Sequence, residues 1–333
     1  ESKSNGLERG VITNVRETIE SLQYAIAESE KQCDHKVDSV FIGISGDHIR
    51  CGNGNGVLSV SDINTAIGRV IEEDDKKRVL ESAKPTNLPS DRRILHVLSQ
   101  HYKVDDRQEN IIEPLGLTGN RLEANVHYVT SSKKTENDFR TCFDALNIDI
   151  DGFVLEPLAS SYSILNHDEK ELGSIMIDIG GGTTDVVIWK NGGIKHTYII
   201  PMGGEIITRD IAQAFRCTLD IAEKLKIKYG CAVEALAPDE NITIKLSNEE
   251  EEINLQFLAK IIEHRIAEIL RETKFEIEKH ISINQLSFGV VITGGGSNLL
   301  NVSDVAENIR SSIVSWGACS QMKDFEVPSS SWV

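Results

Sequence analysis

The segment with the clearest capacity for chemistry is 175–188, in which three glycines and two threonines separate two apolar runs. Glycine has no Cβ, so a hairpin that turns on consecutive glycines can direct several backbone N–H groups at one point. Such a concave set of donors suits a phosphate, and neighbouring hydroxyls can extend it. The segment therefore predicts a phosphate-binding hairpin, with a plain glycine-rich hairpin as the alternative. The expected phosphate contacts are Gly180, Gly181, Gly182, Thr183 and Thr184.

Asp178 stands at the end of the first apolar run, just ahead of these donors. Mg²⁺ in proteins usually takes one or two carboxylates and keeps several of its waters. Asp178 is therefore the expected residue for holding a hydrated Mg²⁺, through water, against the same phosphates.

A second glycine-rich turn, 294–297, follows an apolar strand-like run at 288–293. If the two strands share one sheet, both turns can close around one triphosphate from opposite sides, with the second turn on the nucleoside. This pairing is more specific than either turn alone. Between the two turns, Glu223 and Lys226 place a carboxylate and an ammonium on one helix face, for which an exposed salt bridge is the simplest explanation.

Strands alternate with helices along the chain, which indicates an α/β architecture with helices on the faces of a sheet. Asn14 and Glu17 form a capping-box-like start for the first helix. The Gly/Asn run at 51–56 lacks a lysine or a following helix, so we expect a loop between strands there and not a phosphate loop. Further helices are expected at 72–84, 138–146, 158–165, 206–215, 218–229, 254–280 and 302–309.

Composition excludes several classes of protein. The 333 residues suffice for two domains, and the formal charge of −17 disfavours nucleic-acid binding because a phosphate backbone would be repelled. The six cysteines are scattered without a C-x-x-C pair, which argues against disulfides or structural zinc and favours a reducing cytoplasm. No apolar run has the length of a membrane span, and no secretory signal precedes the first helix. The start at Glu1 and the Ser-rich end suggest a piece of a longer protein.

The motifs together resemble those of the actin/Hsp70/sugar-kinase superfamily. Residues 178–185 resemble its second phosphate motif, 290–297 its adenosine motif, and 201–212 the segment that follows the hairpin. Within the superfamily, the chain resembles the FtsA family of bacterial cell-division actins from about Gly6 to Ser297. The segments that resemble this family are 6–14, 43–49, 94–98, 114–122 and 222–230.

The resemblance implies an actin-like (ribonuclease H-like) two-lobed α/β fold with an inserted FtsA-type 1C subdomain in place of 1B. The family's first phosphate hairpin precedes the helix at Asn14 and is missing from this sequence, so half of the phosphate site is expected to be absent. The expected subdomains are 1–37 (first part of 1A), 38–122 (1C), 123–171 (second part of 1A), 172–205 (2A), 206–285 (2B) and 286–333 (truncated end of 2A).

The resemblance also implies ATP and Mg²⁺ in a cleft between the lobes, with at most weak ATPase activity. Glu156 takes the position of a residue that orders the hydrolytic water; a carboxylate favoured by a helix N-terminus is the alternative. Glu223 and Lys226 would contact ribose or adenine. The remaining nucleotide contacts would be Gly203, Gly204, Glu205, Gly294, Gly295, Gly296 and Ser297.

As a member of this family, the protein would polymerise into actin-like filaments at the division site, on the inner face of the cytoplasmic membrane. It would bind the C-terminal tail of FtsZ through 2B, with Lys224, Arg265 and Arg271 as candidate cations, and later division proteins through 1C. Its membrane anchor, a C-terminal amphipathic helix, is absent from these residues. The alternatives are a sugar or acid kinase of the same superfamily, or an Hsp70-type chaperone.

Overall fold

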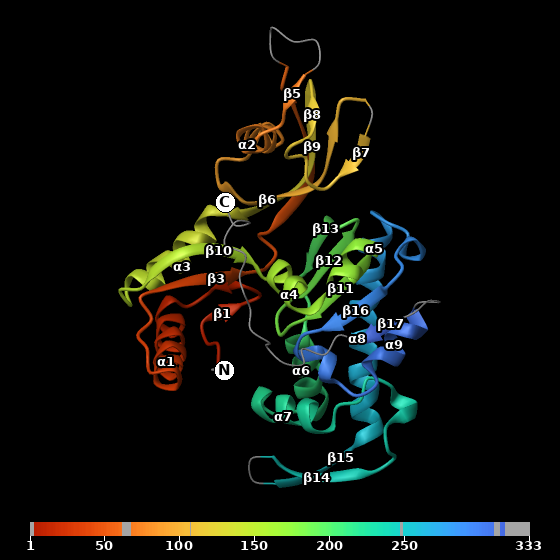
Figure 1. Ribbon diagram of the computed structural model, residues 1–333. Helices are drawn as coiled ribbons and strands as arrows, with labels where there is room; N and C mark the ends of the chain where they lie inside the picture. Colours follow the sequence, from red (N-terminus) through yellow and green to blue (C-terminus); the bar gives the residue numbers. More distant parts are fainter. Residues whose placement is uncertain (1–2, 62–67, 107, 247–248, 310–313, 317–333) are drawn as a thin grey trace.

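A five-stranded sheet contains both glycine-rich segments, in the strand order β13-β12-β11-β16-β17. The computed structural model describes residues 3–61, 68–106, 108–246, 249–309 and 314–316 (Figure 1). β11 is antiparallel to β12 and parallel to β16, so the sheet is mixed. Its strands are β11 (Ser174–Ile179), β12 (Thr184–Lys190), β13 (Gly193–Ile200), β16 (Gly289–Thr293) and β17 (Val314–Trp316).

Both faces of this sheet are buried. Along β11, Ile175 and Ile177 pack into one hydrophobic core with α8 and α9, whereas Met176 packs into another with Leu155 and Leu158. A strand covered on both faces needs no polar alternation, which explains the unbroken apolar run before the glycines. The helices on the α8 side are α6 (Gly204–Phe215), α7 (Leu219–Tyr229), α8 (Leu255–Glu278) and α9 (Val302–Ile309), and β14 (Asn241–Leu246) and β15 (Glu249–Asn254) form a hairpin before α8.

We call residues 173–309 together with β17 the sheet lobe. A smaller N-terminal lobe lies beside it, with α4 between the two in Figure 1. In this lobe, β3 and β10 form a parallel pair. α1 begins as predicted, because the side chain of Asn14 accepts a hydrogen bond from the Glu17 N–H. The elements of this lobe are β1 (Leu7–Glu8), β2 (Val11–Ile12), α1 (Val15–Cys33), β3 (Ser39–Ile44), α3 (Lys133–Asp144), β10 (Asp149–Leu155), α4 (Glu156–Ile164) and α5 (His167–Leu172).

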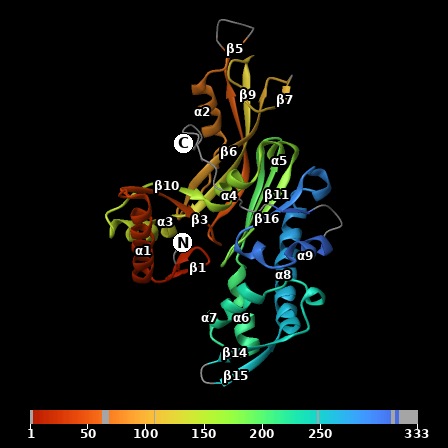
Figure 2. The same cartoon turned by 60° about the horizontal axis from the view of Figure 1, so that its bottom comes forward.

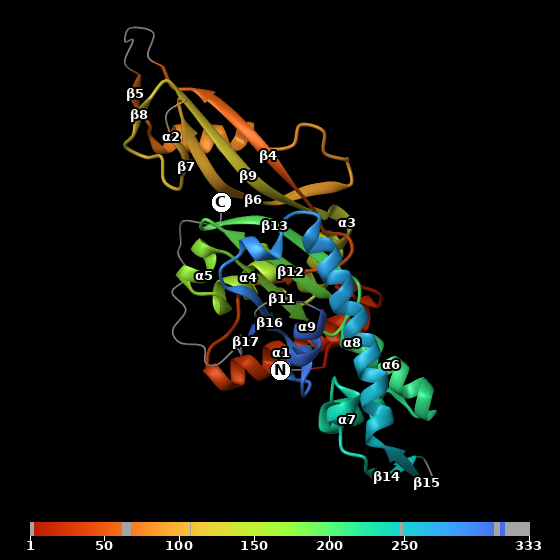
Figure 3. The ribbon, with the colours of Figure 1, turned by 90° about the vertical axis from the view of Figure 1, so that its right-hand side faces the viewer.

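A module with its own hydrophobic core is inserted between β3 and α3 and projects away from both lobes (Figures 1, 2 and 3). It is a four-stranded sheet in the order β4-β9-β6-β7, with α2 packed against β4 and β9. Its elements are β4 (Arg50–Ser59), β5 (Arg69–Val70), α2 (Glu73–Ser82), β6 (Arg92–Val104), β7 (Gln108–Ile111), β8 (Thr118–Gly119) and β9 (Arg121–Ser132).

The loop expected at 51–56 is wrong, because these residues form the middle of β4 and pair with β9. The glycines serve close packing of the strand against α2. A Cβ at Gly54 would lie 2.3 Å from the Ala83 carbonyl oxygen, and one at Gly56 would lie 2.2 Å from the Val79 oxygen. Strand glycines of this kind mark a close approach of another backbone.

Hydrogen bonds attach the module to β13 of the sheet lobe. Gln100 Nε2 donates to the Ile194 carbonyl oxygen at 2.6 Å, and the fully buried His127 shares a 3.0 Å hydrogen bond with the Thr197 hydroxyl. Because these groups are buried and paired, they fix the module on the sheet. Within the described ranges, no helix has the length and apolar character needed to cross a bilayer.

Candidate nucleotide-binding site

The second glycine-rich turn lies against the end of β11, directly before the first turn. β11 and β16 are parallel neighbours, with Asp178 opposite Thr293, so both strands end at the same edge of the sheet. Gly294 has φ +84°, and a Cβ there would lie 2.3 Å from Asp178 Oδ1. A Cβ at Gly296 would lie 2.4 Å from Ile179 Cγ2. The two strands therefore share one sheet, as the pairing of the motifs required, and the closing of the two turns around one triphosphate stays a prediction.

The first turn of α6 is held against the tip of the β11–β12 hairpin. The N–H groups of Gly204 and Glu205 each donate at 2.8 Å, to the carbonyl oxygens of Gly180 and Gly181 respectively. A Cβ at Gly203 would lie 2.5 Å from the Gly181 oxygen, so this approach requires glycine. These contacts place the predicted residues 203–205 beside the predicted phosphate turn.

Two of the expected phosphate donors are already used within the protein. The N–H of Gly180 donates to the Thr183 carbonyl oxygen at 2.9 Å, which closes the turn. The hydroxyl of the buried Thr184 donates to the Met202 carbonyl oxygen at 2.8 Å. At the second turn, the Ser297 hydroxyl donates to the Gly294 oxygen at 2.7 Å. These groups shape the turns, and Gly181 and Gly295 are the exposed glycines of the two.

Glu223 and Lys226 lie on α7 against the first turn of α6. They form an ion pair at 2.7 Å, in which the Lys226 side chain is only 12% exposed. Lys226 Nζ also donates to the Gly204 carbonyl oxygen at 3.0 Å and to the Thr208 hydroxyl at 2.8 Å. The pair is thus part of the structure that positions α6 and not an isolated surface salt bridge.

Three carboxyl groups gather around the end of β11. Asp178 accepts a hydrogen bond from the Ser160 hydroxyl at 2.9 Å, and Asp185 accepts from the Ser45 hydroxyl at 2.8 Å. Glu156 begins α4, and its carboxylate lies next to Gly43 of β3. Ser45 follows β3 in the N-terminal lobe, so the two lobes meet at these acids.

Burial raises the pKa of all three acids, and repulsion by neighbouring carboxylates adds to the pKa of Asp185 and Glu156. Burial raises the pKa of Asp185 to about 7, although the Ser45 hydrogen bond opposes this, and the charges of Glu156 and Asp178 raise it further. Burial also raises the pKa of Asp178, against the Ser160 hydrogen bond. Burial of its carboxyl group raises the pKa of Glu156, and the charge of Asp178 raises it further, although part of the residue borders solvent. A cation would relieve this repulsion.

These residues fit a hydrated Mg²⁺ on a nucleotide. Among the described residues, no three His, Cys, Asp or Glu side chains converge on one metal position, and a Mg²⁺ that keeps several waters needs only one or two carboxylates. A Cβ at Gly295 would meet no atom within 4 Å, so the second turn borders open space. The groups offered to Mg²⁺ and the nucleotide are therefore the Asp178 carboxylate and the two glycine-rich turns.

The sequence-based reasoning assigned no role to Asp185, Ser45 or Ser160. Asp185 could have been found, because it lies opposite Asp178 in the hairpin register. Ser45 and Ser160 gave no such signal, since Ser45 follows β3 and Ser160 lies in α4, and only the tertiary fold brings these segments to this edge.

We predict that Asp185→Asn removes a pH dependence of stability in the nucleotide-free protein. The folded protein binds this proton more tightly than the unfolded chain, so stability falls as pH rises from about 4 to about 7. The free energy of unfolding of the variant should exceed that of the wild type by roughly 2–4 kcal/mol at pH 8, and the two values should lie closer together at pH 5. Urea unfolding at both pH values measures this. Equal pH slopes in the two proteins would contradict it, and the exposed Asp151→Asn serves as control.

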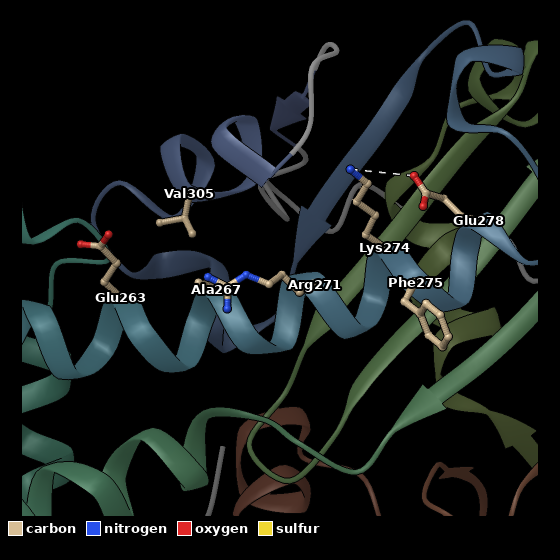
Figure 4. Close-up of a pocket in the computed structure, with 7 residues that line it drawn as sticks. All are labelled: Glu263, Ala267, Arg271, Lys274, Phe275, Glu278 and Val305. Carbon is tan, nitrogen blue, oxygen red and sulfur yellow. Dashed lines mark ion pairs between the residues drawn. The ribbon is translucent and has the colours of Figure 1, made fainter.

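A separate groove of about 500 Å³ lies along α8 (Figure 4). None of the nucleotide-site residues contributes to it. Arg271 lines this groove, whereas Arg265 donates to Asp210 of α6 at 2.7 Å and also pairs with Glu268. The groove is lined by Glu263, Ala267, Arg271, Lys274, Phe275, Glu278 and Val305.

Solved structures show that the fold is actin-like. A PilM–PilN type IV pilus biogenesis complex contains a chain with a TM-score of 0.59 and 13% identity, over 92% of this chain and 76% of that one. MreB5 of Spiroplasma citri, solved with ADP, gives a TM-score of 0.50 and 18% identity over 57% and 62%.

Family comparisons identify the chain more closely. Residues 175–330 match the profile of the cell division protein FtsA, and residues 46–130 match the SHS2 domain inserted in FtsA. The FtsA of Pseudomonas aeruginosa is 39% identical over 92% of this chain and 72% of its own length. The corresponding values are 36%, 97% and 77% for Neisseria meningitidis, and 31%, 95% and 76% for Escherichia coli K12. The chain therefore belongs to the cell division protein FtsA family.

Proposed function

We propose that the protein binds Mg·ATP between its two lobes and assembles into actin-like filaments. The supporting observation is the contact of the second glycine-rich turn with Asp178, which brings the residues expected to meet phosphate, metal and nucleoside to one edge of the sheet. An actin-like neighbour, MreB5, was solved with ADP.

In this proposal Asp178 holds Mg²⁺ through water, Gly181, Gly182 and Thr183 face the phosphates, and 294–297 borders the nucleoside. Bound Mg²⁺ would neutralise phosphate charge. Glu223 and Lys226, which pair on α7 against the first turn of α6, would contact ribose or adenine. Glu156 would accept a hydrogen bond from a water near the terminal phosphate, and its raised pKa accords with the acidic surroundings there.

We further propose that the filaments link the FtsZ ring to the inner face of the cytoplasmic membrane, and that the inserted module contacts later division proteins. The SHS2 match at 46–130 and the pairing of β3 with β10 support a module that begins after Ser45, whereas the sequence-based expectation began it at residue 38. For the FtsZ tail, Arg271 is better placed than Arg265. It lines the α8 groove without an ion pair to any described residue, whereas Arg265 already pairs with two acids.

Sedimentation of the full natural chain tests the function. We expect more protein to pellet with Mg·ATP than without nucleotide, and FtsZ to pellet with anionic lipid vesicles only when this protein is present. Actin-like assembly depends on the bound nucleotide, so ADP should support less pelleting. ATP-independent pelleting together with sugar-dependent release of ADP would contradict the proposal and favour a kinase.

A further inference from the structure

The turn of the first hairpin touches both halves of the candidate site. β1 and β2 are joined by Arg9 and Gly10. A Cβ at Gly10 would lie 2.0 Å from the Ser45 carbonyl oxygen, so this turn packs on the loop that bonds Asp185. A Cβ at Gly182 would lie 3.0 Å from Arg9 Cα, so the same turn also packs on the tip of the phosphate hairpin.

Ion pairs extend this contact between the lobes. Glu8 of β1 lies 3.6 Å from Arg209 of α6, and Lys3 lies 3.7 Å from Asp220 of α7. Each pair is exposed and contributes little by itself. Together with the Gly182 contact, however, they align the first hairpin along the part of the sheet lobe that carries residues 203–205.

Arg9 is well placed to meet an anion at the tip. It is exposed, has φ +48°, and its Cγ lies 3.6 Å from the Cβ position of Gly182. No described residue forms an ion pair with it. Two other cations of this region are already paired, Lys226 with Glu223 and Arg209 with Glu8.

The negative charge around this site favours such a residue. Glu156, Asp178 and Asp185 surround the edge where a triphosphate would bring further negative charge. One Mg²⁺ offsets only part of that sum. A guanidinium offers planar, charge-assisted hydrogen bonds that match phosphate oxygens.

We propose that Arg9 binds the terminal phosphate of a nucleoside triphosphate, so that the β1–β2 turn distinguishes the triphosphate from the diphosphate. This inference rests on the proposed function and adds a phosphate-reading residue contributed by the N-terminal lobe. The turn contacts Ser45 and Gly182 at once, so occupancy of the terminal phosphate position bears directly on how the two lobes meet.

The test measures affinities of a non-hydrolysable ATP analogue and of ADP, both with Mg²⁺, by calorimetry on the full natural chain. Arg9→Asn removes the charge and tolerates the left-handed backbone. Arg9→Lys keeps the charge without the planar fork. We expect Arg9→Asn to weaken binding of the analogue about tenfold or more and binding of ADP less than about threefold. Arg9→Lys should give an intermediate loss of affinity for the analogue. The control, Arg16→Asn, alters an exposed arginine of α1 that pairs with Glu20.

The outcomes separate the two proposals. Retained ADP binding by Arg9→Asn shows that the site is folded. Equal losses for both nucleotides, or no loss for either, overturn the role of Arg9 while leaving the nucleotide site intact in the wild type. A wild-type chain that binds neither nucleotide overturns the proposed function and this inference with it.

Discussion

Gly294→Ala is expected to destabilise the protein and to weaken nucleotide binding by tenfold or more. At φ +84°, a Cβ is strained, and it would lie 2.3 Å from Asp178 Oδ1. Such a backbone conformation costs a non-glycine residue about 1–2 kcal/mol, and displacement of the Asp178 carboxylate adds to this cost. We expect a loss of roughly 1–3 kcal/mol in the free energy of unfolding. Urea unfolding and calorimetric titration with Mg·ATP measure the two effects.

The adjacent glycine supplies a matched control for this prediction. A Cβ at Gly295 would meet nothing within 4 Å, and its φ lies outside the left-handed range. Gly295→Ala should therefore leave stability nearly unchanged, so any loss of affinity in that variant reports contact with the ligand. If both variants lost the same stability, the steric role assigned to Gly294 would be wrong.

The sequence predicted local structure best where one physical signal dominated. The apolar runs on either side of the three glycines gave β11 and β12, and the Asn14 cap gave the start of α1. The helix expected at 138–146 instead begins at Lys133, because the hydroxyl of Ser132 caps the N–H of Thr135. At 51–56 glycine content suggested a loop, although the cause was close packing of α2, which only the fold reveals.

The candidate site divides in the same way. Residues within the motifs, such as Asp178 and the two glycine turns, could be identified from their spacing and from the family resemblance. Ser45, Ser160 and Arg9 could not, because each reaches the site from a different element of the N-terminal lobe. A hydroxyl or a surface arginine gives no signal in sequence until its neighbours are known.

Asp178→Ala is expected to weaken ATP binding about tenfold or more when Mg²⁺ is present, and far less in EDTA. A carboxylate that holds the hydrated metal contributes only when the metal is bound, so the difference between the two conditions isolates its role. Asp178→Asn sharpens the test, because an amide oxygen can still accept the Ser160 hydrogen bond at 2.9 Å. Titration calorimetry of the full natural chain provides both affinities.

The same substitution should act on stability in the opposite direction. Burial raises the pKa of Asp178, so its charge is unfavourable in the nucleotide-free fold. Asp178→Asn should therefore stabilise the nucleotide-free protein while it lowers the affinity for Mg·ATP. Asp151 offers a control, since it accepts a 2.6 Å hydrogen bond from Ser39 in an exposed position away from the glycine turns. Asp151→Asn should change neither quantity. Unchanged Mg·ATP affinity in both Asp178 variants would remove this residue from the metal site, and lower stability of nucleotide-free Asp178→Asn would show that its charge is balanced within the fold.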